Sequence, residues 1–210
     1  MPRASWRSAT AELAARDPSL AAVIDQAGPA ALRSRDPDGP FGALLRAIVF
    51  QQLAGAAAQA IHGRVRALVK GELTPKKVLK LPEEALRGAG LSNSKFLAVR
   101  DLAAKVADGT VELDRISRLG DERIIEELVT VRGIGRWTAE MFLMFELRRL
   151  DVWPVDDLGV RHGYGLMHGV ERPTAKELVP LGDPYRPYRS IAAWYCWQAV
   201  HLERGQITPR

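Results

Sequence analysis

The chain has 210 residues, 47% of them hydrophobic, and its 30 Lys and Arg against 25 Asp and Glu give a formal net charge of +5. This length can bury a core in one or two compact lobes, and the charge favours a polyanionic partner. The single cysteine, Cys196, excludes a disulfide framework and a four-cysteine iron–sulfur cluster. No apolar run approaches the roughly 20 residues of a membrane span, and residues 1–6 lack the apolar segment of a signal peptide, so we expect a cytoplasmic protein.

Nearly every segment of the chain is predicted to be helical. Several helix starts are marked by a capping residue, as at Asp17-Pro18, Thr74-Pro75 and Ser92-Asn93-Ser94. Outside residues 121–164, the predicted helices span residues 18–26, 41–69 (two helices), 75–81, 82–87, 95–107, 174–179 and 188–201. Because no alternating strand pattern appears in the sequence, the predicted fold class is all-α.

Two helices joined by a very short connection are predicted in the middle of the chain. Apolar residues recur at helical spacing over residues 121–131, where Asp121 can cap the helix, and a second helix is predicted over 137–149. Only residues 132–136, with the sequence Arg-Gly-Ile-Gly-Arg, connect them. So short a connection forces the two helices into a hairpin.

The two glycines of this connection have different predicted uses. Gly133 suits the left-handed residue that follows a helix end. Gly135 removes a side chain where the next helix begins, so free backbone N–H groups there can meet an anion closely. The alternative interpretation is a plain tight turn around a buried Ile134.

Two neighbouring carboxylates follow the hairpin. Pro154 prevents the preceding helix from continuing, so Asp156 and Asp157 lie between a loop and a short predicted helix over residues 158–164. We expect one of them to cap that helix and the other to project elsewhere. The alternative is that both are ordinary caps and surface charges. The four histidines show no metal-ligand spacing, so no zinc site is predicted.

The hairpin residues resemble the helix-hairpin-helix motif, whose pattern Leu-x-x-Val-x-Gly-Ile-Gly-x-x-Thr-Ala matches residues 128–139. With the Pro-x-Asp-Asp-Leu-Gly segment at 154–159, the chain resembles the helix-hairpin-helix DNA glycosylase superfamily, and within it the 3-methyladenine DNA glycosylase II branch. Three further stretches agree in the family's order: residues 47–54, 90–95 and 186–195. Few residues precede the matched region, so we expect a minimal form without the extra N-terminal β domain of the classical bacterial relative.

The resemblance implies an all-α fold of two helical lobes, one over residues 46–160 with the hairpin and the other from 1–45 and 161–210. An active-site cleft between the lobes is expected to hold Asp157 on one wall and Trp197 on the other. By the resemblance, Asp157 is the catalytic carboxylate, which stabilises positive charge on the sugar and orients or deprotonates the attacking water. The implied reaction is hydrolysis of the N-glycosidic bond of alkylated bases, such as 3-methyladenine and 7-methylguanine, during base excision repair of double-stranded DNA.

The bifunctional relatives carry a nucleophilic lysine where this chain has Trp137. No lysine lies between Lys105 and Lys176. We therefore expect hydrolysis by water without strand-cleaving lyase activity.

Four side chains are expected to line the base pocket. Trp137 suits stacking on an electron-poor alkylated base, and Trp197 matches a second pocket aromatic. Core packing is the alternative for both. Met141 and Tyr188 stand where the family commonly has tyrosine and tryptophan, which predicts a wider or softer pocket.

Contacts with DNA are expected at two places. By the resemblance, Gln52 is the side chain that fills the gap left by an extruded base, and Leu53 is the adjacent candidate. The alternative is that Gln51 and Gln52 are ordinary polar residues at the end of a helix. The residues expected to hold phosphate are Arg132, Gly133, Gly135, Arg136 and Lys95. By the resemblance, the backbone of Val131 and Gly133 holds a monovalent cation, Na⁺ or K⁺.

Two other functions are compatible with the same motifs. A non-catalytic helix-hairpin-helix module would bind DNA in a salt-sensitive way without releasing a base. A glycosylase for oxidised or mismatched bases would release those bases and leave alkylated ones in place. For each of these functions we expect a monomer that associates with the nucleoid of a bacterial-type cytoplasm.

Overall fold

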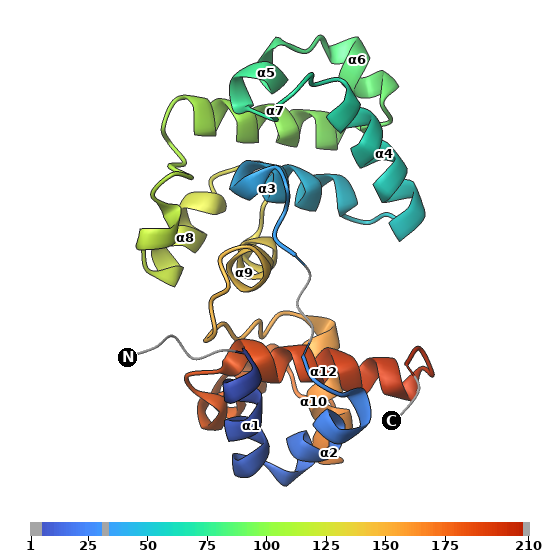
Figure 1. Ribbon diagram of the computed structural model, residues 1–210, viewed down its shortest axis with the longest axis vertical. Coiled ribbons are helices and arrows are strands. Elements are labelled where there is room, and N and C mark those ends of the chain that lie inside the picture. Colours follow the sequence, from blue (N-terminus) through green and yellow to red (C-terminus); the bar gives the residue numbers. More distant parts are fainter. Residues whose placement is uncertain (1–5, 31–33, 208–210) are drawn as a thin grey trace. The chain divides into compact units, whose positions relative to one another are not determined.

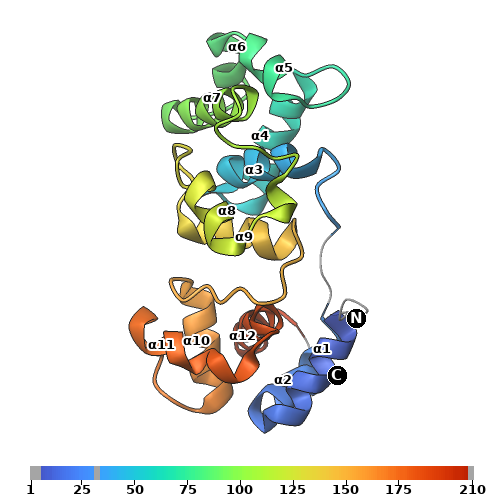
Figure 2. The same ribbon diagram turned by 90° about the vertical axis from the view of Figure 1, so that its left-hand side faces the viewer.

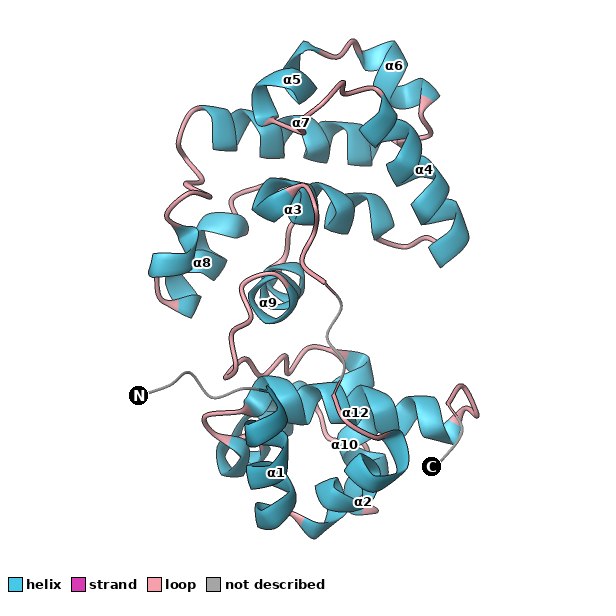
Figure 3. Ribbon diagram, in the orientation of Figure 1, coloured by secondary structure: helices cyan, strands magenta, loops and turns pink. Residues whose placement is uncertain are grey.

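The computed structural model describes residues 6–30 and 34–207, and every regular element in these ranges is a helix (Figure 3). The all-α prediction is confirmed for this part of the chain. None of the described helices is long and apolar enough to cross a membrane. The chain divides into a central unit, residues 34–147, and a terminal unit, built from residues 1–33 and 148–210.

The central unit packs its helices around α7 and α3 (Figure 1). Its elements are α3 (Gly39–Phe50), α4 (Gly55–Ala67), α5 (Pro75–Lys80), α6 (Glu83–Gly88), α7 (Asn93–Ala107), the 3₁₀ helix η1 (Ile116–Arg118), α8 (Asp121–Leu128) and α9 (Arg136–Phe145). The predicted caps are present, because Thr74 accepts a hydrogen bond from Lys77 N and Ser92 accepts one from Lys95 N. Fully buried side chains of α3, α7, α8 and α9 form the core: Leu44, Leu45, Ile48, Leu102, Ile124, Leu128 and Leu143.

The terminal unit packs helices from the N-terminal and C-terminal parts of the chain around α12 (Figure 2). Its elements are α1 (Trp6–Arg16), α2 (Pro18–Ala27), α10 (Leu158–His168), α11 (Ala175–Leu181), the 3₁₀ helix η2 (Asp183–Tyr185) and α12 (Arg189–Glu203). Helix α12 packs against α10, α2 and α1. The α10–α12 crossing is very close, because a Cβ at Gly163 would lie 1.8 Å from the carbonyl oxygen of Cys196. The hydroxyl of Tyr195, a buried core residue, donates to Gly28 O at 3.1 Å.

The unit boundaries differ from the predicted 46–160, and hydrogen bonds explain the difference. Helix α3 is continuous from Gly39, and Asp36 N donates to Glu146 Oε2 at 3.0 Å, which joins the two ends of the central unit. The loop after α9 belongs to α12, because Ser190 N donates to Leu150 O at 2.9 Å. Asp157 and Trp197 therefore lie in the same unit, and the expectation that separate lobes carry them is wrong.

Several helix ends also differ from the predictions: α8 ends at Leu128 and not at residue 131, and α9 ends at Phe145 and not at residue 149. Helix α8 has Gly120 as its N-cap residue, so Asp121 is the first helical residue and not the cap. Helix α10 was predicted to end at residue 164 but continues to His168, where Gly169 ends it in the left-handed conformation with φ +64°. The cause is that α10 packs along α12, which supports a helix longer than its local sequence pattern indicates.

Candidate active site

Asp157 is the N-cap residue of α10. Its Oδ1 accepts a hydrogen bond from Val160 N at 2.8 Å, which confirms that one carboxylate of the pair caps the helix. The neighbouring Asp156 is exposed, whereas Asp157 is partly buried. The second carboxylate of the pair is therefore the one that the fold holds in place.

Asp157 also binds a side chain from another helix. The indole Nε1 of Trp197, on α12, donates to the same Oδ1 at 2.9 Å. Hydrogen bonds to an ionised acceptor are stronger than neutral ones, so two donors from two helices fix the position of this oxygen. The carboxylate is not simply a cap of its own helix.

Gly159 makes the approach of the indole possible. A Cβ at this position would lie 2.8 Å from Trp197 Cδ1 and 3.1 Å from Asp157 Oδ1. A Cβ practically never comes within 3.0 Å of a neighbouring atom, so any larger residue would displace the indole. The glycine in the Asp-Asp-Leu-Gly segment is thus a requirement of the Trp197–Asp157 contact.

Cys196, the residue before Trp197, lies close to this carboxylate and is fully buried. Burial raises the pKa of the Cys196 thiol, and the negative charge of Asp157 raises it further. The thiol therefore stays protonated at neutral pH and is not a nucleophile. In the described residues no group of three or more His, Cys, Asp and Glu side chains is arranged to hold a metal ion.

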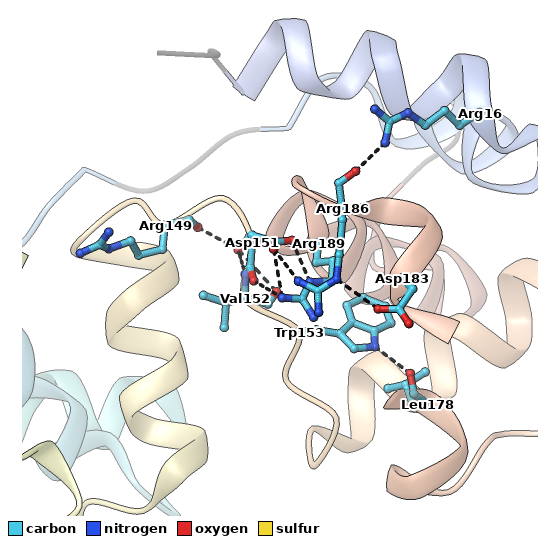
Figure 4. A network of polar contacts seen from close by, with 10 residues as sticks. Arg16, Arg149, Asp151, Val152, Trp153, Leu178, Asp183, Arg186 and Arg189 are labelled. Atoms are coloured by element: carbon cyan, nitrogen blue, oxygen red, sulfur yellow. Dashed lines mark hydrogen bonds and ion pairs between the residues drawn. The ribbon is translucent and has the colours of Figure 1, made fainter. Parts of the chain in front are cut away.

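The start of the loop that leads to Asp157 is bound to the first turn of α12 (Figure 4). Arg189 donates from Nε to Asp151 Oδ1 at 2.7 Å and from Nη2 to Asp151 Oδ2 at 3.0 Å. The hydroxyl of Ser190 donates to Arg149 O at 2.8 Å and accepts from Val152 N at 2.9 Å. These bonds hold residues 149–152 on the same helix that carries Trp197.

A second layer of contacts surrounds the Asp151 carboxylate (Figure 4). Arg186 donates from Nη1 to Asp151 Oδ2 at 2.9 Å and from Nε to Asp183 Oδ1 at 3.1 Å. Arg16 of α1 in turn donates to Arg186 O at 2.7 Å. These bonds give a structural reason for the Arg-Pro-Tyr-Arg-Ser segment at residues 186–190.

Tyr188 lies away from the Trp197–Asp157 contact. It precedes Trp197 by nine residues, which on a helix is half a turn out of phase and about 13 Å along the axis. Its ring centroid is 5.9 Å from the guanidinium carbon of Arg16, and both burial and Glu12 of α1 raise the pKa of its hydroxyl. The structure thus places Tyr188 against α1, and its predicted place in a base pocket stays a prediction.

The two other predicted pocket residues lie on α9 in the central unit. Trp137 is 45% exposed at the start of the helix, so the alternative of core packing is wrong for it. Met141 follows four residues later, on the same face of α9, and is partly buried. On α12, Tyr195 is fully buried in the core, whereas Trp197 is partly buried, and its place in the base pocket stays a prediction.

The two helices form a hairpin with Gly133 in the predicted left-handed conformation, but the connection spans residues 129–135 and not only the predicted 132–136. Helix α8 ends at Leu128, α9 begins at Arg136, and Gly133 adopts the left-handed conformation with φ +79°. Ile134 is buried, whereas residues 132, 133 and 135–137 are exposed. Within the described residues no side chain caps the start of α9, so its first N–H groups suit an anion.

The carbonyl groups predicted to hold a monovalent cation already accept hydrogen bonds. Gly133 O accepts from Gln51 Nε2 at 2.8 Å, and Val131 O accepts from Ile134 N at 3.0 Å. A carbonyl oxygen has two lone pairs, so both groups still fit a shared cation. The cation stays a prediction from the resemblance.

Two of the predicted phosphate ligands have partners inside the protein. Arg136 donates both Nη atoms to Glu122, at 3.0 and 2.6 Å, and its Nε to Glu140 at 3.2 Å; Glu122 raises the pKa of the guanidinium. Lys95 Nζ donates to Val49 O and Gln51 O, each at 2.7 Å. In this structure Arg136 and Lys95 stabilise the hairpin and the end of α3, and their contacts with phosphate remain predictions.

Three features of the site were not predicted from the sequence. They are the space that Gly159 provides, the bonds of Arg189 and Ser190 to residues 149–152, and the bond from Gln51 to the hairpin. The sequence did contain a signal for the first two, since the Asp-Asp-Leu-Gly and Arg-Pro-Tyr-Arg-Ser segments both matched the family pattern. What those segments contact is visible only in the fold.

Comparison with known proteins gives a consistent result. Residues 45–181 match the model of the family described as "HhH-GPD superfamily base excision DNA repair protein". The chain is 36% identical over 174 residues to DNA-3-methyladenine glycosylase 1 of Schizosaccharomyces pombe, covering 81% of this chain and 76% of that protein. It is similar to the structure of 3-methyladenine DNA glycosylase of S. pombe in complex with abasic DNA, with a TM-score of 0.80, 33% identity, and 90% and 94% of the two chains covered. The structure of a DNA-3-methyladenine glycosidase from Bacillus halodurans matches with a TM-score of 0.84, 36% identity, and 94% and 91% coverage.

Proposed function

We propose an activity and a catalytic residue on one premise: this chain belongs to the HhH-GPD superfamily of base excision DNA repair proteins. Relatives named as DNA-3-methyladenine glycosylases match over most of both chains. The chain is accordingly a DNA glycosylase that removes alkylated bases, and Asp157 is its catalytic carboxylate. The observation that carries the assignment of Asp157 is its pair of hydrogen bonds, from Val160 N and Trp197 Nε1.

The reaction requires negative charge at a fixed place. Breaking the N-glycosidic bond builds positive charge on the deoxyribose ring, and a carboxylate held beside the ring stabilises that charge. Two donors keep Asp157 Oδ1 in position before the reaction begins, so no reorganisation is needed as the charge develops. The same carboxylate orients or deprotonates the water that attacks the sugar.

The enzyme is proposed to be monofunctional, in the manner of the 3-methyladenine DNA glycosylase II branch. A lyase reaction needs an amine that attacks the sugar, and this chain has Trp137 at the position where bifunctional relatives carry lysine. Cationic bases such as 3-methyladenine and 7-methylguanine are good leaving groups, so one carboxylate suffices for them. The exposed face of Trp137 suits stacking on such an electron-poor base.

The proposed partner is double-stranded DNA that contains alkylated bases, bound by a monomer. The exposed hairpin with its uncapped α9 start is the proposed phosphate site, with the Arg132 side chain as a second contact. The neighbouring turn at Gln52 and Leu53 is the proposed part that enters the duplex.

Substitution of Asp157 by asparagine tests the catalytic assignment. Asparagine keeps an oxygen that can accept from Val160 N and Trp197 Nε1 but removes the charge, so single-turnover release of 3-methyladenine should fall by about 10²- to 10³-fold. Mass spectrometry of the bases released from methylated duplex DNA measures this rate. Asp156→Asn, on the exposed neighbour, is the matched control and should keep the wild-type rate. Equal release by Asp157→Asn and wild type would refute the role of Asp157.

The same reactions separate the remaining alternatives. A monofunctional enzyme leaves the strand intact until alkali is added, and borohydride traps no covalent complex. Strand cleavage without alkali would contradict the monofunctional assignment. Salt-sensitive DNA binding with no release of any base would instead indicate a non-catalytic binding module, and release from an oxidised duplex alone would indicate a different lesion.

A further inference from the structure

The turn between α3 and α4 has a strained residue at its exposed tip. Gln52 has φ +55°, in the left-handed region that non-glycine residues rarely adopt. Its side chain is exposed, and the next residue, Leu53, is an exposed large hydrophobic residue. Such a conformation persists only where surrounding contacts fix it, and it occurs preferentially at functional sites. The contacts that fix this turn therefore indicate what its shape serves.

One set of contacts comes from α7. Lys95, in the first turn of α7, donates from Nζ to Val49 O and Gln51 O, each at 2.7 Å. Val49 is in the last turn of α3, and Gln51 is the residue before the strained one. The ammonium is partly buried in this position, and burial lowers the pKa of Lys95. Lys95 thus fixes the path of the backbone as it leaves α3.

The second contact joins the turn to the hairpin. The side-chain amide of Gln51 donates from Nε2 to Gly133 O at 2.8 Å and lies 3.5 Å from Thr138 Oγ1. A backbone carbonyl can only accept, so the amide must present its NH₂ group to Gly133. One side chain therefore spans from the base of the strained turn to the tip of the hairpin.

Helix α7 supports the hairpin as well as the turn. The amide N–H of Arg132, next to Gly133, donates to Asp101 Oδ2 at 2.7 Å. Lys105 Nζ donates to Thr130 O, in the same connection. Residues on α7 and α3 thus hold the turn and the hairpin in a single frame, in which α3 and α7 pack together (Figure 1).

We propose that Gln51 is a positioning residue for base extrusion: it fixes the Gln52–Leu53 turn relative to the phosphate-binding hairpin. The inference rests on the proposed function, in which the hairpin holds the DNA backbone and the turn enters the duplex. The Gln51 side chain, bonded to Gly133 O, fixes the distance between the turn and the hairpin. When the hairpin has bound a phosphate, that distance sets how deeply the turn enters the duplex. Without the contact between Gln51 and Gly133 the protein still binds DNA, but it no longer holds a nucleotide outside the base stack of the duplex.

Two variants of Gln51 test this. Gln51→Ala removes the donor, and Gln51→Glu places a carboxylate against Gly133 O, so the second change is expected to be more harmful. The probe is an alkylated duplex with 2-aminopurine beside the lesion, whose fluorescence rises when the stack opens. For Gln51→Ala we expect most of the fluorescence rise to be lost and single-turnover base release to fall about tenfold. Binding to undamaged duplex, measured by anisotropy, should stay within about twofold of wild type, because Asp101 and Lys105 of α7 still hold the hairpin backbone.

Controls make the outcome specific. Gln26→Ala, on α2 in the terminal unit, removes an exposed glutamine whose side chain donates to Ala22 O of its own helix, and this variant should behave as wild type. Thermal unfolding of every variant checks that the fold is intact. A lesion placed opposite a mismatched base costs less to extrude, so it should recover part of the lost rate in Gln51→Ala.

Each failure has its own signature. No base release by wild type would overturn the proposed function itself. Wild-type fluorescence and rate in a Gln52→Ala/Leu53→Ala double variant would overturn the role of the turn, and the role of Gln51 with it. A defect in that double variant but wild-type behaviour of Gln51→Ala and Gln51→Glu would overturn only the positioning role.

Discussion

The Asp157 site of the terminal unit and the hairpin of the central unit are both held by hydrogen bonds, but in different ways. At Asp157, donors from two helices meet one carboxylate oxygen, and the site is partly buried. At the hairpin, side chains such as Asp101 and Gln51 bind the backbone from behind and leave residues 132, 133 and 135 exposed. A reacting charge needs partners that hold it still, whereas a surface for phosphate needs open amides on a fixed backbone. Substitutions at the Asp157 site should therefore lower the rate of base release, and substitutions at the hairpin should weaken DNA binding.

Among substitutions that leave the Asp157 side chain itself unchanged, the largest effect is expected from Gly159→Ala. The new Cβ would lie 2.8 Å from Trp197 Cδ1, so the indole must move and its bond to Asp157 is lost. Displacement of a catalytic group by about 1 Å can cost 10²-fold in rate, and we expect about this loss in single-turnover base release. Affinity for undamaged DNA, measured by anisotropy, should not change. Gly88→Ala, where a Cβ would meet nothing within 4 Å, is the control. A wild-type rate in Gly159→Ala would mean that the Trp197–Asp157 contact is dispensable.

A smaller loss is expected from Arg189→Ala, which acts on Asp157 only through the loop. The substitution removes the bonds to Asp151 at 2.7 and 3.0 Å and leaves Arg186 as the remaining partner of that carboxylate. We expect the rate of base release to fall about tenfold and the free energy of unfolding to fall by about 2 kcal/mol. Single-turnover assays measure the rate of base release, and urea unfolding measures the free energy of unfolding. Arg189→Lys should recover part of the stability, since it keeps one charge but not the two-atom contact. If stability falls and the rate does not, Arg189 has a structural role alone.

Sequence patterns over a few neighbouring residues predicted the features that depend only on those residues. The caps at Asp17, Thr74 and Ser92 and the left-handed Gly133 follow from neighbouring residues, and all are present. The prediction of Asp121 as a cap was wrong because Gly120 is the N-cap residue and Asp121 is already the first residue of the helix.

Partners distant in the sequence could not be predicted in this way. Arg136 and Lys95 were predicted only as phosphate ligands, but each binds partners distant in the chain, Glu122 and the end of α3. The Trp197–Asp157 bond joins residues 40 apart, and no helical or strand periodicity encodes a pair at that separation. The family pattern marked those positions, and only the packing of α10 on α12 shows what they contact.

The two hairpin glycines should respond differently to substitution. Gly133 has φ +79°, and a Cβ there would lie 3.3 Å from Ala98 Cβ, so Gly133→Ala should lower the free energy of unfolding by about 1 to 2 kcal/mol. Gly135 has φ −95°, and a Cβ there would meet nothing within 4 Å, so Gly135→Ala should unfold like wild type. Both variants should bind undamaged duplex several-fold more weakly, because the phosphate approaches the backbone there. Thermal unfolding and anisotropy measure the two effects. Wild-type affinity in Gly135→Ala would argue against phosphate at this helix start.

The smallest effect is expected on the pH dependence of stability, from one partly buried histidine in each unit. Burial lowers the pKa of both His168 in the terminal unit and His62 in the central unit. His168 Nε2 lies 2.9 Å from the Tyr185 hydroxyl, which donates to Asp17 Oδ2 at 2.7 Å, so the neutral ring donates to the hydroxyl oxygen. A lowered pKa means that the unfolded chain binds the proton more tightly. Stability is therefore full above the unfolded value of about 6.5 and is lost as the pH falls from there towards the folded pKa.

Each histidine contributes at most about 1.4 kcal/mol per pH unit to this slope. His168→Gln keeps a donor for Tyr185 and cannot titrate, so urea unfolding between pH 7 and pH 5 should show a shallower loss of stability than wild type. His62, which packs edge-on against Phe50 with ring centroids 6.1 Å apart, supplies the remaining slope, and a double variant should flatten it further. Neither histidine belongs to the hairpin, so DNA affinity at neutral pH should be the same in wild type and both variants. An unchanged slope in His168→Gln would assign the acid sensitivity to His62 or to carboxylates in place of the terminal-unit histidine.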